Sequence, residues 1–128
     1  MNLIVTHTSS LGINEDLQQD IILRANAYNI INLYVIDEND AAVSLTDCEI
    51  RFIVKEIPSD SDDAAVIDKE ITDFTDALNG QCEIDLEKED VADLVGNYIF
   101  NIILTDSSDN EFILCEGNVN FKKTLLEE

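Results

Sequence analysis

Few side chains in this sequence have the chemistry of a catalyst. The one histidine, His7, stands near Ser9 and Ser10, and a serine nucleophile with a histidine base would use these residue types. Such a pair must be held rigidly by separate elements, and neighbours on one short segment are not preorganised in that way. The four glycines are scattered, so no phosphate-binding loop is indicated. We therefore predict that the chain is not an enzyme and that it binds no cofactor.

Cysteine usage points in the same direction. Cys48, Cys82 and Cys115 lack the paired spacing of a zinc site, and each sits in or beside an expected strand. An odd number without a disulfide framework favours reduced, buried thiols in a cytosolic setting. A disulfide or a reactive thiol is the alternative.

The acidic loops call for a test of calcium binding. An EF-hand loop needs glycine at its sixth position and a bidentate glutamate at its twelfth. Neither a loop that starts at Asp37 nor one that starts at Asp106 has these residues. A looser site in the run of Asp60, Asp62 and Asp63 stays open, although such a run is more often a solvated loop. No metal site is predicted.

The charge and the length of the chain argue against several further classes of protein. The 128 residues include 28 acidic and 7 basic side chains, for a net charge of -21, and 45% are hydrophobic. One domain with a packed core is expected. The charge argues against nucleic acid and against anionic membranes, because both are bound through Lys and Arg. No apolar run approaches the ~18 residues of a membrane span, and no secretion signal is apparent.

Hydrophobic alternation predicts about seven short strands and little helix, which is typical of an all-β, immunoglobulin-like antiparallel sandwich. We expect one short helical turn over residues 87–94, and a bulge at Gly117 in the last strand. The sandwich is assigned to residues 17–121, an N-terminal arm or extra strand to residues 1–16, and a tail to residues 122–128. The expected strands are residues 17–24, 28–36, 48–56, 66–71, 81–86, 98–104 and 111–121.

One corner carries a specific expectation. Leu94, Gly96 and Tyr98 bring a turn into an alternating strand, and immunoglobulin-like sandwiches place a tyrosine at this point. We expect the Tyr98 ring to be buried and its hydroxyl to donate to upstream backbone.

Outward-facing isoleucines suggest a contact surface. The third, sixth and seventh strands usually share a sheet, whose solvent side would carry Ile53, Ile99, Ile103 and Ile113. An apolar patch of this kind usually marks a binding surface. Alternatively, residues 2–5 fold back and cover it. The opposite sheet offers a second outer face, with Ile30, Tyr34 and Ile36.

Three segments carry a resemblance to a known family. They are Val43-Ser44-Leu45-Thr46 before a strand, Leu94, Gly96 and Tyr98 at the corner, and Glu116-Gly117 in the last strand. Over residues 17–121 the chain resembles the immunoglobulin-like N-terminal domain of tailed-phage baseplate upper proteins and related virion modules. The turn after Asp37 differs, because the usual glycine and proline are missing.

This resemblance implies a structural subunit of a phage virion, either a capsid-decorating protein or a tail or baseplate adaptor. Its partners would be other virion proteins, with self-association as a further option, and without nucleic acid or membrane. It would be made in the host cytoplasm and located in the virion. Two alternatives stay open: a carbohydrate- or cell-surface-binding module assisted by calcium, and an acidic inhibitor of a basic host protein.

Overall fold

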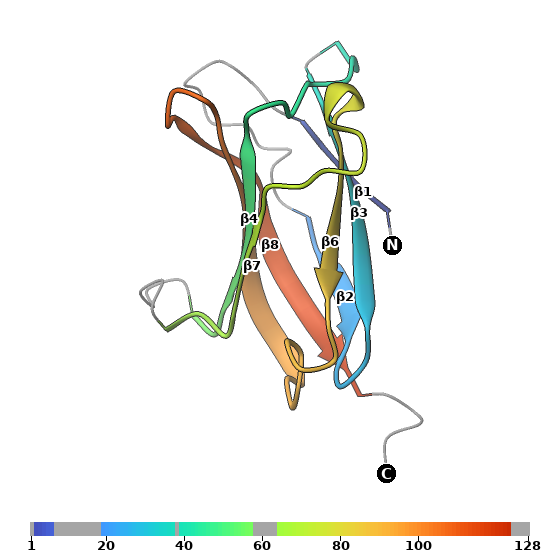
Figure 1. Ribbon diagram of the computed structural model, residues 1–128. Coiled ribbons are helices and arrows are strands. Elements are labelled where there is room, and N and C mark those ends of the chain that lie inside the picture. The colour runs from blue at the N-terminus through green and yellow to red at the C-terminus, as the bar shows by residue number, and fades with distance from the viewer. Residues whose placement is uncertain (1, 7–18, 38, 58–63, 124–128) are drawn as a thin grey trace.

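A computed structural model describes residues 2–6, 19–37, 39–57 and 64–123 of the chain. The described residues form eight strands in two sheets that pack face to face (Figure 1). The strands are β1 (Asn2–Thr6), β2 (Ile21–Arg24), β3 (Asn29–Ile36), β4 (Glu49–Lys55), β5 (Ile67–Ile71), β6 (Gln81–Leu86), β7 (Gly96–Thr105) and β8 (Glu111–Lys122).

The strand order is that of an immunoglobulin-like sandwich. One sheet has the order β1-β3-β6, and the other has the order β2-β8-β7-β4-β5. The third, sixth and seventh expected strands, now β4, β7 and β8, therefore share a sheet as predicted. The two outlying strands β1 and β2 pair in parallel with β3 and β8, whereas the other neighbours are antiparallel.

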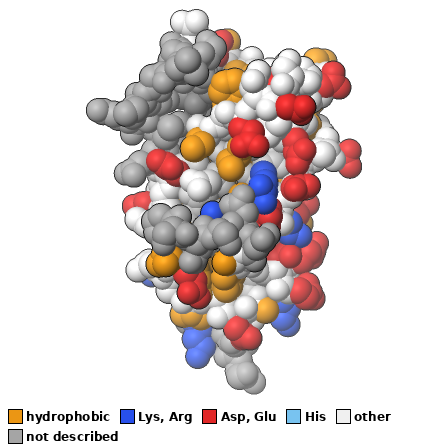
Figure 2. Space-filling model, turned by 90° about the vertical axis from the view of Figure 1, so that its left-hand side faces the viewer, with side chains coloured by type: hydrophobic (Ala, Val, Ile, Leu, Met, Phe, Trp, Pro, Cys, Tyr) orange, Lys and Arg blue, Asp and Glu red, His pale blue; other side chains and the backbone are white. Residues whose placement is uncertain are grey.

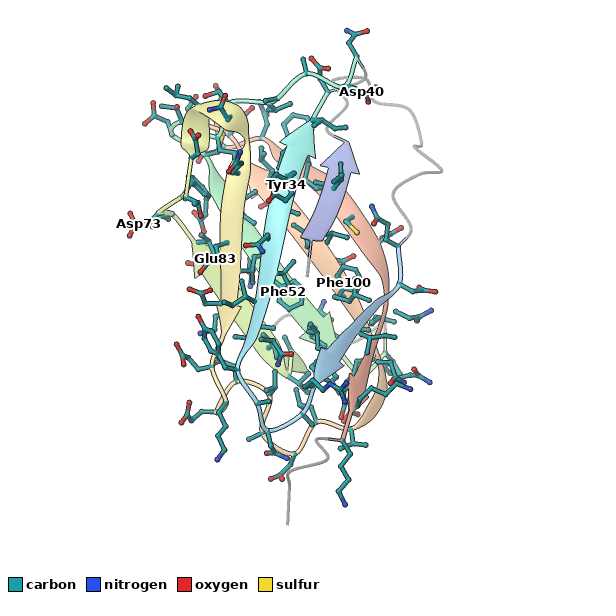
Figure 3. All side chains as sticks on the ribbon, turned by 90° about the vertical axis from the view of Figure 1, so that its right-hand side faces the viewer. Tyr34, Asp40, Phe52, Asp73, Glu83 and Phe100 are labelled. Carbon is teal, nitrogen blue, oxygen red and sulfur yellow. The ribbon has the colours of Figure 1, made fainter. Side chains whose placement is uncertain are left out.

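Alternation of side chains explains why these segments are strands. In β3, Ile31, Leu33 and Val35 are fully buried while the residues between them are half-buried. Such a pattern places every second side chain between the sheets. The Phe52 and Phe100 rings meet there at 5.9 Å between centroids (Figure 3). Burial of each such side chain contributes about 1.5–3 kcal/mol.

The seven expected strands are all present, with ends that differ by a few residues. Of the two alternatives for the N-terminal segment, the described residues 2–6 form an extra strand. The short helix is elsewhere than expected, because a 3-10 turn, η3, occupies Ala77–Asn79. Residues 87–94 instead form hydrogen-bonded turns, in which the Asp90 carboxylate accepts the Glu87 N–H at 2.8 Å.

The corner before β7 is built differently from the expectation. Gly96 has φ of 100°, a conformation that glycine adopts without strain, and Leu94 packs against the core. The half-buried Tyr98 ring meets Phe121 edge to face, with centroids 5.4 Å apart. Within the described part of the chain, the Tyr98 hydroxyl makes no hydrogen bond, so the expected bond to upstream backbone is absent there. Tyr98 acts through ring packing.

The Tyr98→Phe variant should therefore keep its free energy of unfolding to within about 0.5 kcal/mol, because the ring contact survives. Tyr98→Ala should lose about 1.5–3 kcal/mol with the ring. Urea denaturation of the three proteins measures both differences. A large loss in the phenylalanine variant would show that the hydroxyl is a structural partner after all.

Acidic residues build two of the hairpin turns. In one, the Asp37 carboxylate accepts the N–H groups of Asn39 and Ala41 at 2.8 and 3.0 Å. Asp106 repeats this arrangement in the β7–β8 turn and accepts two N–H groups, both at 2.9 Å. Short carboxylates stabilise turns in this way because they replace the backbone acceptor that a strand would supply. These loops thus use their carboxylates structurally.

Gly117 does not mark a bulge, contrary to the expectation. The register shift between β7 and β8 lies at Ile102 and Ile103. Gly117 instead lies under the chain that enters β2, where the Gln19 N–H donates to the Glu116 carbonyl at 2.9 Å. A Cβ atom at Gly117 would stand 1.9 Å from the Gln19 carbonyl oxygen. Close approach of two backbones, which was not visible locally, requires glycine here.

Gly117→Ala should consequently lower the free energy of unfolding by about 1–3 kcal/mol or more, since backbone must move to accept the methyl group. The neighbouring, exposed Asn118 provides the matched control, and Asn118→Ala should change stability by less than about 0.5 kcal/mol. Thermal and denaturant unfolding report both values. Equal stability of the two variants would contradict the tight crossing at Gly117.

Candidate functional site

The four isoleucines do lie on one side of the five-stranded sheet. Along β7, Ile99 and Ile103 flank Asn101, and Ile53 of β4 pairs with Asn101 from one side. Ile103 pairs with Ile113 of β8 on the other side. Cross-strand and diagonal neighbours on one face are within side-chain contact range. The register therefore brings together the residues that the alternation selected.

Their exposure differs from the expectation at one position. Ile113 is 49% exposed and Ile99 and Ile103 are half-buried, but Ile53 is only 2% exposed. Within the sheet, Ile53 lies between Asp68 of β5 on one side and Asn101 of β7 on the other. Ile53 is therefore wrong as a solvent-facing contact residue. The contact surface is reduced to Ile99, Ile103 and Ile113, which we call the isoleucine face.

Residues 2–5 do not cover this face, because β1 belongs to the other sheet. Figure 2 looks onto the molecule from the side of β4 and β7. Where described side chains are visible, the hydrophobic ones form several small patches, and acidic side chains crowd one margin. The described part of this surface that is visible in Figure 2 is therefore mixed in character.

A hollow of about 440 Å³ opens beside Ile99. A second hollow of about 350 Å³ adjoins it and shares Asp20 and Asn118. The wall of the first hollow combines amide and apolar groups with the carboxylates of Asp20 and Glu116 and the amine of Lys55. Beside the second hollow, Asn120 donates to Asn97 at 2.6 Å. The first hollow is lined by Asp20, Lys55, Ile99, Phe100, Asn101, Glu116, Gly117 and Asn118.

Charge on β4 is largely compensated within the sheet. The Arg51 guanidinium donates two hydrogen bonds to the Asp68 carboxylate, at 2.8 and 2.6 Å. These hydrogen bonds lower the pKa of Asp68. Arg51 therefore stiffens the β4–β5 edge of the isoleucine face.

The smaller sheet has an outer face that sequence reasoning described only in part. Ile30, Tyr34 and Ile36 of β3 lie there as expected, and Ile4 of β1, 59% exposed, pairs with Tyr34. Figure 3 shows this side, with Tyr34 on β3 and Glu83 on the edge strand β6. Leu3, Ile4 and Val5 are consecutive apolar residues, so the sequence gives no alternation that would assign Ile4 to an outer face.

Acidic groups concentrate along β6. A hydrogen bond with Asp85, followed by the negative charge of that group, raises the pKa of Glu83. Partial burial, and then a hydrogen bond to Asp85, raises the pKa of Tyr28. The β6 side of this sheet therefore carries two adjacent carboxyl groups that repel each other and favour a cation nearby.

No family model and no curated protein matches the chain in sequence. Among solved structures, the N-terminal domain of phage TP901-1 ORF48 matches with a TM-score of 0.60 and 13% identity, covering 95% of this chain and 98% of that one. The chain has the fold of a phage protein domain. The resemblance to an immunoglobulin-like N-terminal domain of a phage protein is therefore confirmed at the level of fold.

Two further structures are more distant. The fibronectin(III)-like modules of Clostridium thermocellum CbhA match with a TM-score of 0.42 and 10% identity, over 84% of this chain and 91% of that one. Auracyanin A, a blue copper protein from Chloroflexus aurantiacus, matches with a TM-score of 0.43 and 13% identity, over 95% and 98%.

Among the described residues, no group of three or more His, Cys, Asp or Glu side chains could hold a metal ion. Nor is any helix there long and apolar enough to cross a membrane. His7, Ser9, Ser10 and the run of Asp60, Asp62 and Asp63 lie outside the described residues.

The three cysteines are free thiols of unequal burial. Cys82 and Cys115 are buried in the core, and Cys48 is half-buried. Burial, with nearby carboxylates, raises the pKa of the Cys82 and Cys115 thiols to about 12. A thiol of this kind has almost no thiolate at neutral pH and is a poor nucleophile.

These pKa values predict an alkaline loss of stability. The unfolded thiols ionise near 9.0 and the folded ones near 12, so the unfolded state releases protons first as the pH rises. The free energy of unfolding should be unaffected by these thiols below about pH 8.5, and should then fall by up to about 1.4 kcal/mol per pH unit for each thiol.

Denaturant titrations between pH 8 and 10.5 measure this slope. A variant with Cys82→Ala and Cys115→Ala is less stable at pH 8 because of its cavities, but its slope above pH 9 should be shallower. The half-buried Cys48 thiol and the Tyr28 phenol, whose pKa values are also raised, contribute to the slope that remains. Identical slopes in the two proteins would contradict the buried, protonated thiols.

Proposed function

We propose that the chain is a non-enzymatic structural subunit of a tailed-phage particle, which docks onto other virion proteins as a capsid-decorating protein or a tail or baseplate adaptor. The observation that carries this proposal is the match to the N-terminal domain of phage TP901-1 ORF48 over nearly the whole of both chains. The three sequence segments that resemble tailed-phage virion modules support it independently. In this proposal the protein is made in the host cytoplasm and resides in the virion.

The chemistry of the described side chains suits a structural role. The buried thiols are protonated, and the carboxylates of Asp37 and Asp106 are engaged as turn acceptors. The hollow beside Ile99 presents amide, apolar and charged groups. Mixed surfaces of this kind are typical of contacts with another protein.

Docking through the isoleucine face would use β7, the strand of this face whose outward side chains carry no charge. With a net charge of -21, this chain repels acidic surfaces, so a contact is least costly where acids are sparse. The outward side chains of β7, from Asn97 to Thr105, include no acid, and the nearest acids of this face, Glu49, Glu111 and Glu116, lie beside β7 on β4 and β8. Burial of Ile99, Ile103 and Ile113 would supply apolar contact at about 25 cal/mol per Å². Self-association through this face is a further arrangement within the same proposal.

Two charged substitutions test this docking surface. Ile103→Asp with Ile113→Asp places carboxylates on adjacent strands of the isoleucine face, and we expect a folded protein that no longer co-purifies with phage particles. Leu78→Asp, at a 74% exposed position on η3, adds a charge away from the face and should leave particle association unchanged.

The readout is the amount of tagged protein in particles purified by density gradient from the phage-producing host, with melting temperature as the folding check. Absence of the unmodified protein from particles would overturn the virion role. Unchanged incorporation of the double variant would overturn the isoleucine face as the docking surface.

A further inference from the structure

The backbone of β6 has one free side. β6 pairs only with β3, and the register places Leu33 opposite Cys82 and Ile31 opposite Ile84. On the opposite side, Gln81 exchanges backbone hydrogen bonds with Asp76, at 3.0 and 3.2 Å. Because backbone groups alternate along an antiparallel strand, Glu83 and Asp85 also direct their N–H and C=O groups away from β3.

The chain itself closes both ends of this edge. Asp76 pairs with Gln81 at one end, and the Asp90 carboxylate accepts the Glu87 N–H at the other. Between these ends, the backbone N–H and C=O groups of Glu83 and Asp85 have no hydrogen-bond partner within the described residues. An unpaired stretch of strand edge is a template for another strand.

Side chains along β6 define what kind of strand fits. The Glu83 and Asp85 side chains lie on the outer face, half-buried and exposed, while Cys82, Ile84 and Leu86 are buried. Among the described residues, no Lys or Arg forms an ion pair with either carboxylate. A strand added to this edge would place its own outward side chains beside both carboxylates, since cross-strand neighbours are about 5 Å apart.

A second copy of the chain is a poor occupant of this edge. Antiparallel pairing of β6 with its own counterpart would bring Glu83 and Asp85 against the same acids, and like charges directly opposite each other destabilise a strand pair. Acidic residues on an edge strand are a known obstacle to such self-pairing. The occupant that complements this edge is therefore a strand of opposite charge.

We propose that the open edge of β6 binds a short extended segment of a partner protein, in which Lys or Arg alternate with apolar residues. The partner's backbone would pair with Glu83 and Asp85, and its basic side chains would lie beside their carboxylates. This mode of binding uses the smaller sheet and does not depend on the isoleucine face or on a virion role.

Amide exchange, followed by NMR on the full chain, tests the proposal with a short peptide of alternating Lys and Val as the probe. The Glu83 and Asp85 amides should exchange more slowly with the peptide, whereas those of Cys82, Ile84 and Leu86 already bond to β3 and should not change. An alternating Glu and Val peptide should have no effect. Protection spread over the whole surface, or absent from Glu83 and Asp85, would overturn the proposal.

Variants separate this site from general charge attraction. Glu83→Gln with Asp85→Asn should weaken binding of the lysine peptide by about twofold to thirtyfold, as expected for the loss of two cross-strand charge pairs. Glu49→Gln with Glu111→Gln makes the same charge change on the other sheet, where both residues pair with Thr105, and should retain the affinity. Equal weakening of the two variants would show nonspecific attraction and refute the site.

A backbone substitution tests strand pairing itself. Asp85→Pro removes an N–H that points away from β3, and proline is tolerated on the free side of an edge strand. The variant should fold but lose peptide-induced protection of Glu83. Retained protection would show that the peptide binds through charge alone. If these experiments fail while the protein is still found in phage particles, the proposed function stands and only the β6 site falls.

Discussion

Burial of alternate apolar side chains between the two sheets is the interaction on which the rest of this structure depends. Phe52, Phe100 and Phe121 are enclosed there with aliphatic neighbours, and none of the described buried residues is polar or charged. Because the net charge of -21 opposes compaction, this core must outweigh considerable self-repulsion. The inner faces are therefore reserved for packing, and any recognition must use outer faces and edges.

Acidity in this chain has a structural component. The five described non-glycine residues with positive φ are all Asn or Asp, the residue types that adopt this conformation most readily, and the carboxylates of Asp37 and Asp106 hold hairpin turns. Part of the charge thus follows from how the turns are made. The extreme composition is for this reason a weak guide to function, whereas the local pattern on β6 is more specific.

The sequence predicted features that depend on local periodicity, and it missed features that depend on distant segments. Alternation of Ile31, Leu33 and Val35 was sufficient to identify β3 and its inner face. It also placed Ile99 and Ile103 on one outer face, but it did not predict that Ile53, on the same face, is buried. Glycine is required at position 117 because the Gln19 backbone lies against it. The edge of β6 is free because, among the described strands, only β3 pairs with β6. Neither relation leaves a local signal.

The place of β8 has a consequence for the order of events in folding. Although it is the last of the described strands in sequence, β8 lies between β2 and β7, and the Asn118 N–H donates to the Asp20 carboxylate across 98 positions. The larger sheet therefore cannot close before residue 122 has left the ribosome. Until then β2 and β7 each present an unsatisfied edge, and the high acidity of the chain helps to keep such a nascent intermediate from aggregating. Closure over so long a loop also predicts slow acquisition of the native state, in the millisecond-to-second range that is typical of β-sandwiches.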